Sequence, residues 1–172
     1  LFNKLTRSRK AVVRNEPGVT RDILVETADW WGQVFEVVDT GGITEDKSGF
    51  SPLIRQQTLQ ALKDVDLIVA VMDAKSGLCP EDRDLMRIVK EAAKPFVVVV
   101  NKVDRTHEAD LYISEFYEFG VDLIAASFEQ DFGIDQIVEW VLENRPPLEV
   151  TKQEGFRLTI VGKPNAGKSS LC

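Results

Sequence analysis

The sequence predicts an α/β fold with a mostly parallel six-stranded sheet, helices on both faces and one antiparallel strand. Three observations support this fold class. Aliphatic runs alternate with amphipathic stretches, the runs are nearly continuous, and polar or glycine-rich turns follow them. Near-continuous aliphatic runs are typical of strands buried on both faces, and their alternation with helices indicates a parallel sheet.

Four aliphatic runs carry this pattern. The first three are paired with helical stretches: Leu67–Met72 with Pro80–Ala93, Phe96–Val100 with Glu108–Phe119, and Leu123–Ala126 with Ile134–Glu143. The fourth run, Leu158–Val161, leads into a glycine-rich turn. We expect all four runs to be parallel strands of one sheet.

The first third of the chain has a different pattern. Ile23–Asp29 and Gln33–Val38 flank Trp30-Trp31-Gly32, which predicts a hairpin and therefore the antiparallel strand. Ser51–Lys63 has apolar residues at helical spacing. Lys10–Arg21 is polar, contains a Pro-Gly pair, and is predicted to be a loop.

Composition narrows the class of protein. A chain of 172 residues with 44% hydrophobic and 28% charged residues fits one globular domain, and a formal net charge of -7 argues against a general basic surface for nucleic acids. The two cysteines, Cys79 and Cys172, lack metal-site spacing, which favours reduced thiols in a cytoplasmic protein. No apolar run reaches the roughly 18 residues of a membrane span, and no signal peptide is recognisable. Because the chain begins at Leu1, we expect it to be part of a longer protein.

The most specific motif is GKPNAGKS at residues 162–169, which matches GxxxxGK[ST] directly after an aliphatic strand. Such a loop wraps backbone N–H groups around phosphates at the start of a helix. Lys168 is expected to contact the β- and γ-phosphates, and the Ser169 hydroxyl to bind Mg2+. The nucleotide-binding residues predicted here are Asn165, Ala166, Gly167, Lys168, Ser169 and Ser170. An unliganded glycine-rich turn is the alternative.

A second motif, Asp39-Thr40-Gly41-Gly42, ends the strand predicted at Gln33–Val38. Ligands of open α/β sheets bind outside the carboxyl ends of strands. There the Asp39 carboxylate can hold Mg2+, and the Gly42 N–H can meet the γ-phosphate. Taken alone, this motif also fits an ordinary strand-ending turn.

A third motif, Asn101-Lys102-Val103-Asp104, follows the strand Phe96–Val100. The Asp104 carboxylate can accept hydrogen bonds from the N1–H and 2-amino groups of guanine, a donor pair that adenine lacks. The Lys102 stem can lie over the base, and Asn101 can tie its loop to the phosphate-binding loop. A polar loop without a ligand is the alternative.

Two weaker candidates complete the predicted site. Thr20, in the loop predicted at Lys10–Arg21, can bind Mg2+ when that loop closes; taken alone, the pattern fits an ordinary Pro-Gly turn better. Ser127 can place a backbone N–H near the guanine O6, and Phe128 follows it in the same loop. The predicted catalytic residues are Lys168, Thr20 and Gly42, and the predicted metal ligands are Ser169, Thr20 and Asp39.

Together these motifs resemble the G domain of P-loop NTPases, and most closely the EngA (Der) family of GTPases with two G domains in tandem. The segments that carry the resemblance are PGVTRD, VDTGGI, NKVD and GKPNAGKSSL, and Leu1–Leu5 resembles the helix that follows a P-loop. The resemblance implies binding of GTP and GDP with Mg2+, hydrolysis of GTP by water, and a role in assembly of the large ribosomal subunit. It also implies that Asn165 can help to hold K+, because Ile43 stands where many other GTPases carry a water-orienting glutamine; an Asn165 that only shapes the turn is the alternative.

The order of the motifs differs from that of a complete G domain, in which the P-loop comes first. We expect residues 1–147 to be a G domain without its first strand and P-loop, 148–155 a linker, and 156–172 a strand plus P-loop. That last segment either begins a second G domain or completes the first in permuted order. The strand is predicted to fill the central place of the sheet, within the chain or by swapping in a homodimer, because the linker can span about 28 Å. The alternatives to a GTPase are a nucleotide-binding module without turnover and an incomplete fragment.

Overall fold

The computed structural model describes residues 1–6, 12–14, 23–39, 52–104, 109–146 and 156–162. The strands are β1 (Val12–Arg14), β2 (Ile23–Trp30), β3 (Gln33–Asp39), β4 (Leu67–Asp73), β5 (Phe96–Asn101), β6 (Leu123–Ala125) and β7 (Phe156–Gly162). The α-helices are α1 (Phe2–Thr6), α2 (Pro52–Ala61), α3 (Pro80–Glu91), α4 (Ala109–Ile113) and α5 (Ile134–Asn144). The 3-10 helices in the described ranges are η1 (Ala74–Ser76) and η3 (Ser114–Phe119).

The described strands form one seven-stranded sheet in the order β1-β2-β3-β7-β4-β5-β6. The strands from β3 to β6 in this order are parallel, and β2 pairs antiparallel with both β1 and β3. Among the described strands, only β2 therefore runs antiparallel to the others. The predicted fold class is confirmed, with one strand more than the six expected.

The additional strand is β1, which corrects part of the loop predicted at Lys10–Arg21. Its residues pair with β2 in the register Val12↔Val25 and Arg14↔Ile23. The β-branched Val12-Val13 pair suits an extended strand, and pairing satisfies backbone groups at the free edge of β2. The remainder of that predicted loop lies outside the described residues.

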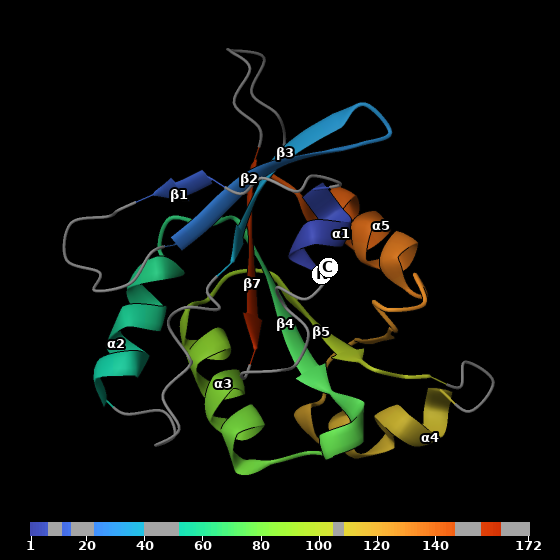
Figure 1. Ribbon diagram of the computed structural model, residues 1–172. Coiled ribbons are helices and arrows are strands. Elements are labelled where there is room, and N and C mark those ends of the chain that lie inside the picture. The colour runs from blue at the N-terminus through green and yellow to red at the C-terminus, as the bar shows by residue number, and fades with distance from the viewer. Residues whose placement is uncertain (7–11, 15–22, 40–51, 105–108, 147–155, 163–172) are drawn as a thin grey trace.

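Strand β7 occupies the centre of the sheet, as the sequence predicts (Figure 1). It pairs in parallel with β3 through Val37↔Leu158 and with β4 through Val69↔Ile160. Four consecutive side chains of this strand, Leu158 to Val161, are fully buried. Without β7, the facing edges of β3 and β4 would be unpaired inside the sheet.

Helices cover both faces of the sheet, and the alternation of strand side chains divides the core into two halves (Figure 1). Val69 and Val71 of β4 face α1 and α5, where they join a cluster that includes Phe2 and Ile137. The intervening Ala70 faces the side covered by α2, α3, α4 and η3. Within the described ranges, no helix has the length and apolarity needed to cross a bilayer.

The β2–β3 hairpin closes through two residues, because both Trp31 (φ 52°) and Gly32 (φ 76°) have the positive φ of a type I′ turn. The sequence predicts Trp30 in the segment between the two strands, but this residue ends β2 and is buried. Its Nε1 donates a hydrogen bond of 2.7 Å to the Leu5 carbonyl. The hairpin thereby fixes the end of α1, whose Leu5 side chain is fully buried.

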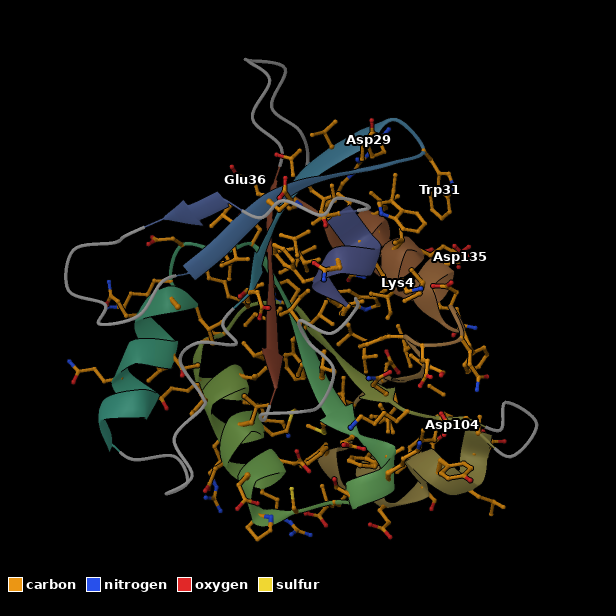
Figure 2. The ribbon with its side chains drawn as sticks, in the orientation of Figure 1. Lys4, Asp29, Trp31, Glu36, Asp104 and Asp135 are labelled. Carbon is orange, nitrogen blue, oxygen red and sulfur yellow. The ribbon has the colours of Figure 1, made fainter. Side chains whose placement is uncertain are left out.

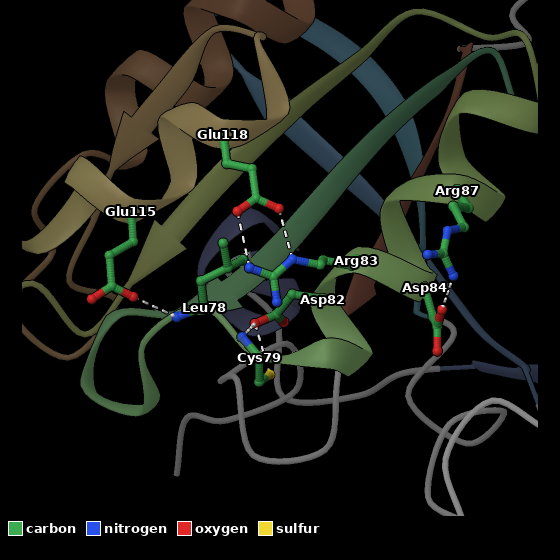
Figure 3. A network of polar contacts seen from close by, with 8 residues as sticks. All are labelled: Leu78, Cys79, Asp82, Arg83, Asp84, Arg87, Glu115 and Glu118. Carbon is green, nitrogen blue, oxygen red and sulfur yellow. Dashed lines mark hydrogen bonds and ion pairs between the residues drawn. The ribbon is translucent and has the colours of Figure 1, made fainter.

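The helix predicted at Glu108–Phe119 is shorter than expected, since α4 ends at Ile113 and η3 follows it. With three residues per turn, a 3-10 helix places Phe116 and Phe119 on one face, and both rings are buried. Figure 3 shows how η3 is joined to α3: both Glu118 carboxylate oxygens accept hydrogen bonds from Arg83, at 2.6 and 2.9 Å. These contacts hold η3 against α3.

Candidate nucleotide-binding site

All parallel strands end at one edge of the sheet, and polar residues collect there. The last residues of β3, β4 and β5 are Asp39, Asp73 and Asn101, and β7 ends at Gly162. The register Asp73↔Asn101 and Val71↔Gly162 places these ends side by side. Of the residues predicted from sequence, those described at this edge are Asp39, Asn101, Lys102, Asp104, Ser127 and Phe128.

The remaining predicted residues lie outside the described part of the chain. They are Thr20, Gly42, Asn165, Ala166, Gly167, Lys168, Ser169 and Ser170. Gly162, the first residue of the predicted P-loop, is described as the last residue of β7. The motif therefore starts at the carboxyl edge of the central strand.

Asp39 is suited to a hard cation. It ends β3, is 2% exposed, and pairs with Leu24 on one side and Ile160 on the other. No group of three His, Cys, Asp or Glu able to hold a metal occurs among the described residues. The residues fit Mg2+, because this ion is usually held by one or two carboxylates together with water and phosphate oxygens.

Asn101 joins two loops of the site. It is 3% exposed, and its Oδ1 accepts a hydrogen bond of 3.0 Å from the Phe128 backbone N–H. A second tie runs from the Val103 N–H to the Ala126 carbonyl, also at 3.0 Å. The loop after β5 is thus fixed to the loop after β6, whereas the expected tie from Asn101 to the P-loop involves residues outside those described.

Lys102 is anchored by a residue that sequence reasoning missed. Its Nζ lies 2.7 Å from Oδ2 of Asp73, whose side chain is 7% exposed. Burial alone would raise the pKa of Asp73, but the hydrogen bond and charge of Lys102, with the N–H groups of Lys75 and Ser76, hold the pKa below its ordinary value. The only sequence signal for Asp73 is its place at the end of an aliphatic run, the position that Asp39 also takes.

Asp104 has a basic partner that was also missed. Its Oδ2 lies 2.6 Å from Nζ of Lys75, and both side chains are substantially exposed. The hydrogen bond and charge of Asp104 raise the pKa of Lys75, and Glu129 adds a smaller effect of the same sign. Figure 2 shows Asp104 beyond the end of β5 and close to α4. A lysine in a polar turn gives no sequence signal of this pairing.

The Ser127 N–H, which the sequence predicts near the guanine O6, donates a hydrogen bond of 3.0 Å to the Phe132 carbonyl. A bridge between these two residues closes the loop after β6, which uses the N–H internally. The Phe128 N–H is bonded to Asn101, and the Phe128 ring belongs to the core beneath α1 and α5. The Ser127 hydroxyl is buried and, within the described part of the chain, has no hydrogen-bond partner.

Solved structures share this architecture. Era from Aquifex aeolicus, solved with GDP and AlF4-, superposes with a TM-score of 0.68 at 22% identity, covering 88% of this chain and 54% of that chain. The cytosolic domain of Thermotoga maritima FeoB in a GDP form gives a TM-score of 0.63 at 21% identity, covering 88% of this chain and 63% of that chain. These structural neighbours, the strand order and the motifs at the sheet edge together define the class of protein, which is an α/β P-loop GTPase fold.

Sequence comparison gives the family. The sequence profile described as "50S ribosome-binding GTPase" matches residues 1–102, and the chain belongs to that family. GTPase Der of Persephonella marina is 43% identical over 183 residues, and GTPase Der of Sulfurihydrogenibium sp. is 44% identical over 182 residues. In each case the alignment covers 99% of this chain and 41% of the relative, so the chain spans less than half the length of these proteins.

Proposed function

We propose that this chain binds GTP and GDP with Mg2+ and hydrolyses GTP to GDP and phosphate. The observation that supports this most is the carboxyl edge of the sheet. There Gly162, which opens the P-loop motif, ends the strand between Asp39 of β3 and Asp73 of β4, and Asn101 ends the next strand. One nucleotide can reach all of these strand ends, because ligands of open α/β sheets bind across this edge.

Base recognition is assigned to the segment after β5. The Asp104 carboxylate accepts from guanine N1–H and the 2-amino group, and the Lys102 stem lies along the base. Adenine has no matching donor pair, so it would leave the carboxylate unpaired. The tie between Asn101 and Phe128, 3.0 Å long, keeps the adjoining loops in place around the base.

Phosphate binding is assigned to the residues of the P-loop motif and its neighbours. Lys168 and the backbone N–H groups from Asn165 to Ser170 surround the phosphates, while Gly42 meets the γ-phosphate. Ser169, Thr20 and Asp39 would hold Mg2+, which would supply positive charge beside the phosphates. The water attacks a γ-phosphate polarised by these groups.

Ile43 stands where a water-orienting glutamine would be useful, and its side chain has no polar group. We therefore include K+ near Asn165 as a second source of positive charge. GTPase rates measured in KCl and in NaCl test this point: faster turnover in KCl is expected, and equal rates would count against it.

The cellular role proposed is assembly of the large ribosomal subunit in the cytoplasm. The family description, 50S ribosome-binding GTPase, and the similarity to proteins named GTPase Der support it. We also propose that residues 1–147 form the G domain and that residues 156–172, after the linker 148–155, supply its central strand and P-loop. In an alternative arrangement, a second copy of the chain in a homodimer supplies that strand.

The proposal is tested by replacing the base-recognising carboxylate. Asp104→Ala removes two hydrogen bonds to a charged group, so GDP affinity is expected to fall about 100-fold or more. Asp110→Ala, at an exposed carboxylate on α4, is the matched control and should bind GDP as the unmodified chain does. Calorimetric titration with GDP and ADP measures both, and single-turnover GTP hydrolysis separates an enzyme from a binding module. Equal affinity for GDP and ADP in the unmodified chain would overturn the proposal.

A further inference from the structure

We infer that Asp73, which lies outside the three nucleotide-binding motifs, is a positioning residue for guanine binding. It holds Lys102 directly and Asp104 through Lys75. This inference rests on the proposed function, because Lys102 and Asp104 are the residues assigned to the base.

The geometry at Asp73 supports the inference. The two oxygens of its carboxylate have different partners, since Oδ1 accepts a hydrogen bond of 2.9 Å from the Lys75 N–H and Oδ2 lies 2.7 Å from the Lys102 Nζ. The side chain is 7% exposed, so these bonds form largely away from water. Its register partner is Asn101, which places the carboxylate directly beside the start of the base-binding segment.

For Lys102, the ion pair holds a residue with a strained backbone and a long side chain. Its φ of 70° is a left-handed conformation that is strained for a non-glycine residue, so surrounding contacts must maintain it. Holding the ammonium at Asp73 leaves the aliphatic stem of Lys102 to lie along the base. It also keeps this ammonium away from Asp104, two residues further along the chain.

For Asp104, the effect passes through the turn after β4. Asp73 is the N-cap of η1 and fixes the backbone of Lys75, whose Nζ lies 2.6 Å from Asp104 Oδ2. Two carboxylates and two ammonium groups therefore alternate along this edge. Neutralising Asp73 would release the Lys102 ammonium, which could then compete with guanine for the Asp104 carboxylate. It would also loosen the turn that holds Lys75, and with it the contact by which Lys75 positions Asp104.

The test is a double-mutant cycle on GDP affinity with Asp73→Asn and Lys102→Met. Asparagine keeps an oxygen for the Lys75 N–H but loses the ion pair, and we expect GDP to bind about tenfold more weakly. Both substitutions remove the same contact, the ion pair between Asp73 and Lys102. The double variant should therefore bind GDP no more weakly than whichever single variant has the lower affinity. Additive losses would overturn the inference, as would an Asp73→Asn variant that binds GDP within twofold of the unmodified chain.

A buried-carboxylate control separates positioning from general destabilisation. Asp82 is fully buried and caps α3 by accepting from the Cys79 N–H at 3.1 Å, in the network of Figure 3. Asp82→Asn should lower the melting temperature without changing GDP affinity at a temperature where the protein is folded. An equal loss of affinity in Asp82→Asn and Asp73→Asn would reduce Asp73 to a merely structural role and contradict the inference.

A second variant covers the case in which Asp73→Asn does not fold. Lys75 is 57% exposed, so Lys75→Met leaves the core intact, and we expect about threefold weaker GDP binding. Unchanged or tighter binding would overturn the route through Lys75. If the unmodified chain does not bind GDP, both the proposed function and this inference fail. If the unmodified chain binds GDP and the variants bind it with the same affinity, only the inference fails.

Discussion

At the scale of single residues, the motifs predicted the residues assigned to nucleotide binding, but they did not predict the charged residues that contact them. Asn101 and Asp104 could be predicted because their residue types and spacing match the donors of guanine. Asp73 and Lys75 could not, because their partners are defined by the register of β4 against β5 and by the turn at η1, which no local pattern encodes. For the same reason, the loop closure that uses the Ser127 N–H was invisible in the sequence.

The pKa of Asp73 makes stability depend on pH. Its folded-state pKa is depressed mainly by Lys102 against the effect of burial, so the ion pair contributes stability above the unfolded pKa of about 3.9 and loses it as pH falls through the folded pKa. Urea unfolding should show Asp73→Asn less stable by about 1–2 kcal/mol from pH 5 to 7, a difference that shrinks below about pH 4. A difference that stays constant down to pH 2.5 would show that the ion pair is not its source.

At the scale of elements, aliphatic runs predicted the strands and their order of appearance well. The errors occur where tertiary contacts decide the local structure. The predicted loop contains β1 because the edge of β2 offers pairing, and the helix after β5 changes to η3 because Phe116 and Phe119 both turn toward the core. Neither influence is expressed in local periodicity.

A pair of glycines tests how closely the loop before α5 approaches β6, with Gly133 in that loop and Gly120 as the comparison. Gly120 and Gly133 both have positive φ, but a Cβ on Gly120 meets nothing within 4 Å, whereas a Cβ on Gly133 would lie 2.4 Å from the Ala125 carbonyl oxygen. Gly120→Ala should cost about 1 kcal/mol, from backbone conformation alone. Gly133→Ala should cost about 2–4 kcal/mol, since β6 must also shift. Chemical denaturation measures both, and equal losses would refute the close approach.

At the scale of the whole molecule, the site depends on contacts between distant parts of the chain. Strand β7 pairs with β3 from more than a hundred residues away, as in Val37↔Leu158. The central place of this strand could be predicted for two reasons. A sheet without it would keep two unpaired edges, and Leu158–Val161 was the aliphatic run not yet assigned to another place in the sheet. With β7 in that place, the start of the P-loop lies at the edge that carries Asp39 and Asn101.

The central claim is that this P-loop and the base-binding segment hold one guanine nucleotide, and Lys168→Ala tests it most directly. Calorimetric titration with GDP and Mg2+ should give one site per chain in the unmodified protein and an affinity about 100-fold lower in the variant, because a charged contact to the phosphates is lost. Lys63→Ala, at an exposed lysine bonded to Gln60, is the control and should bind as the unmodified protein does. GDP affinity unchanged by Lys168→Ala would contradict the claim and remove the P-loop from the site.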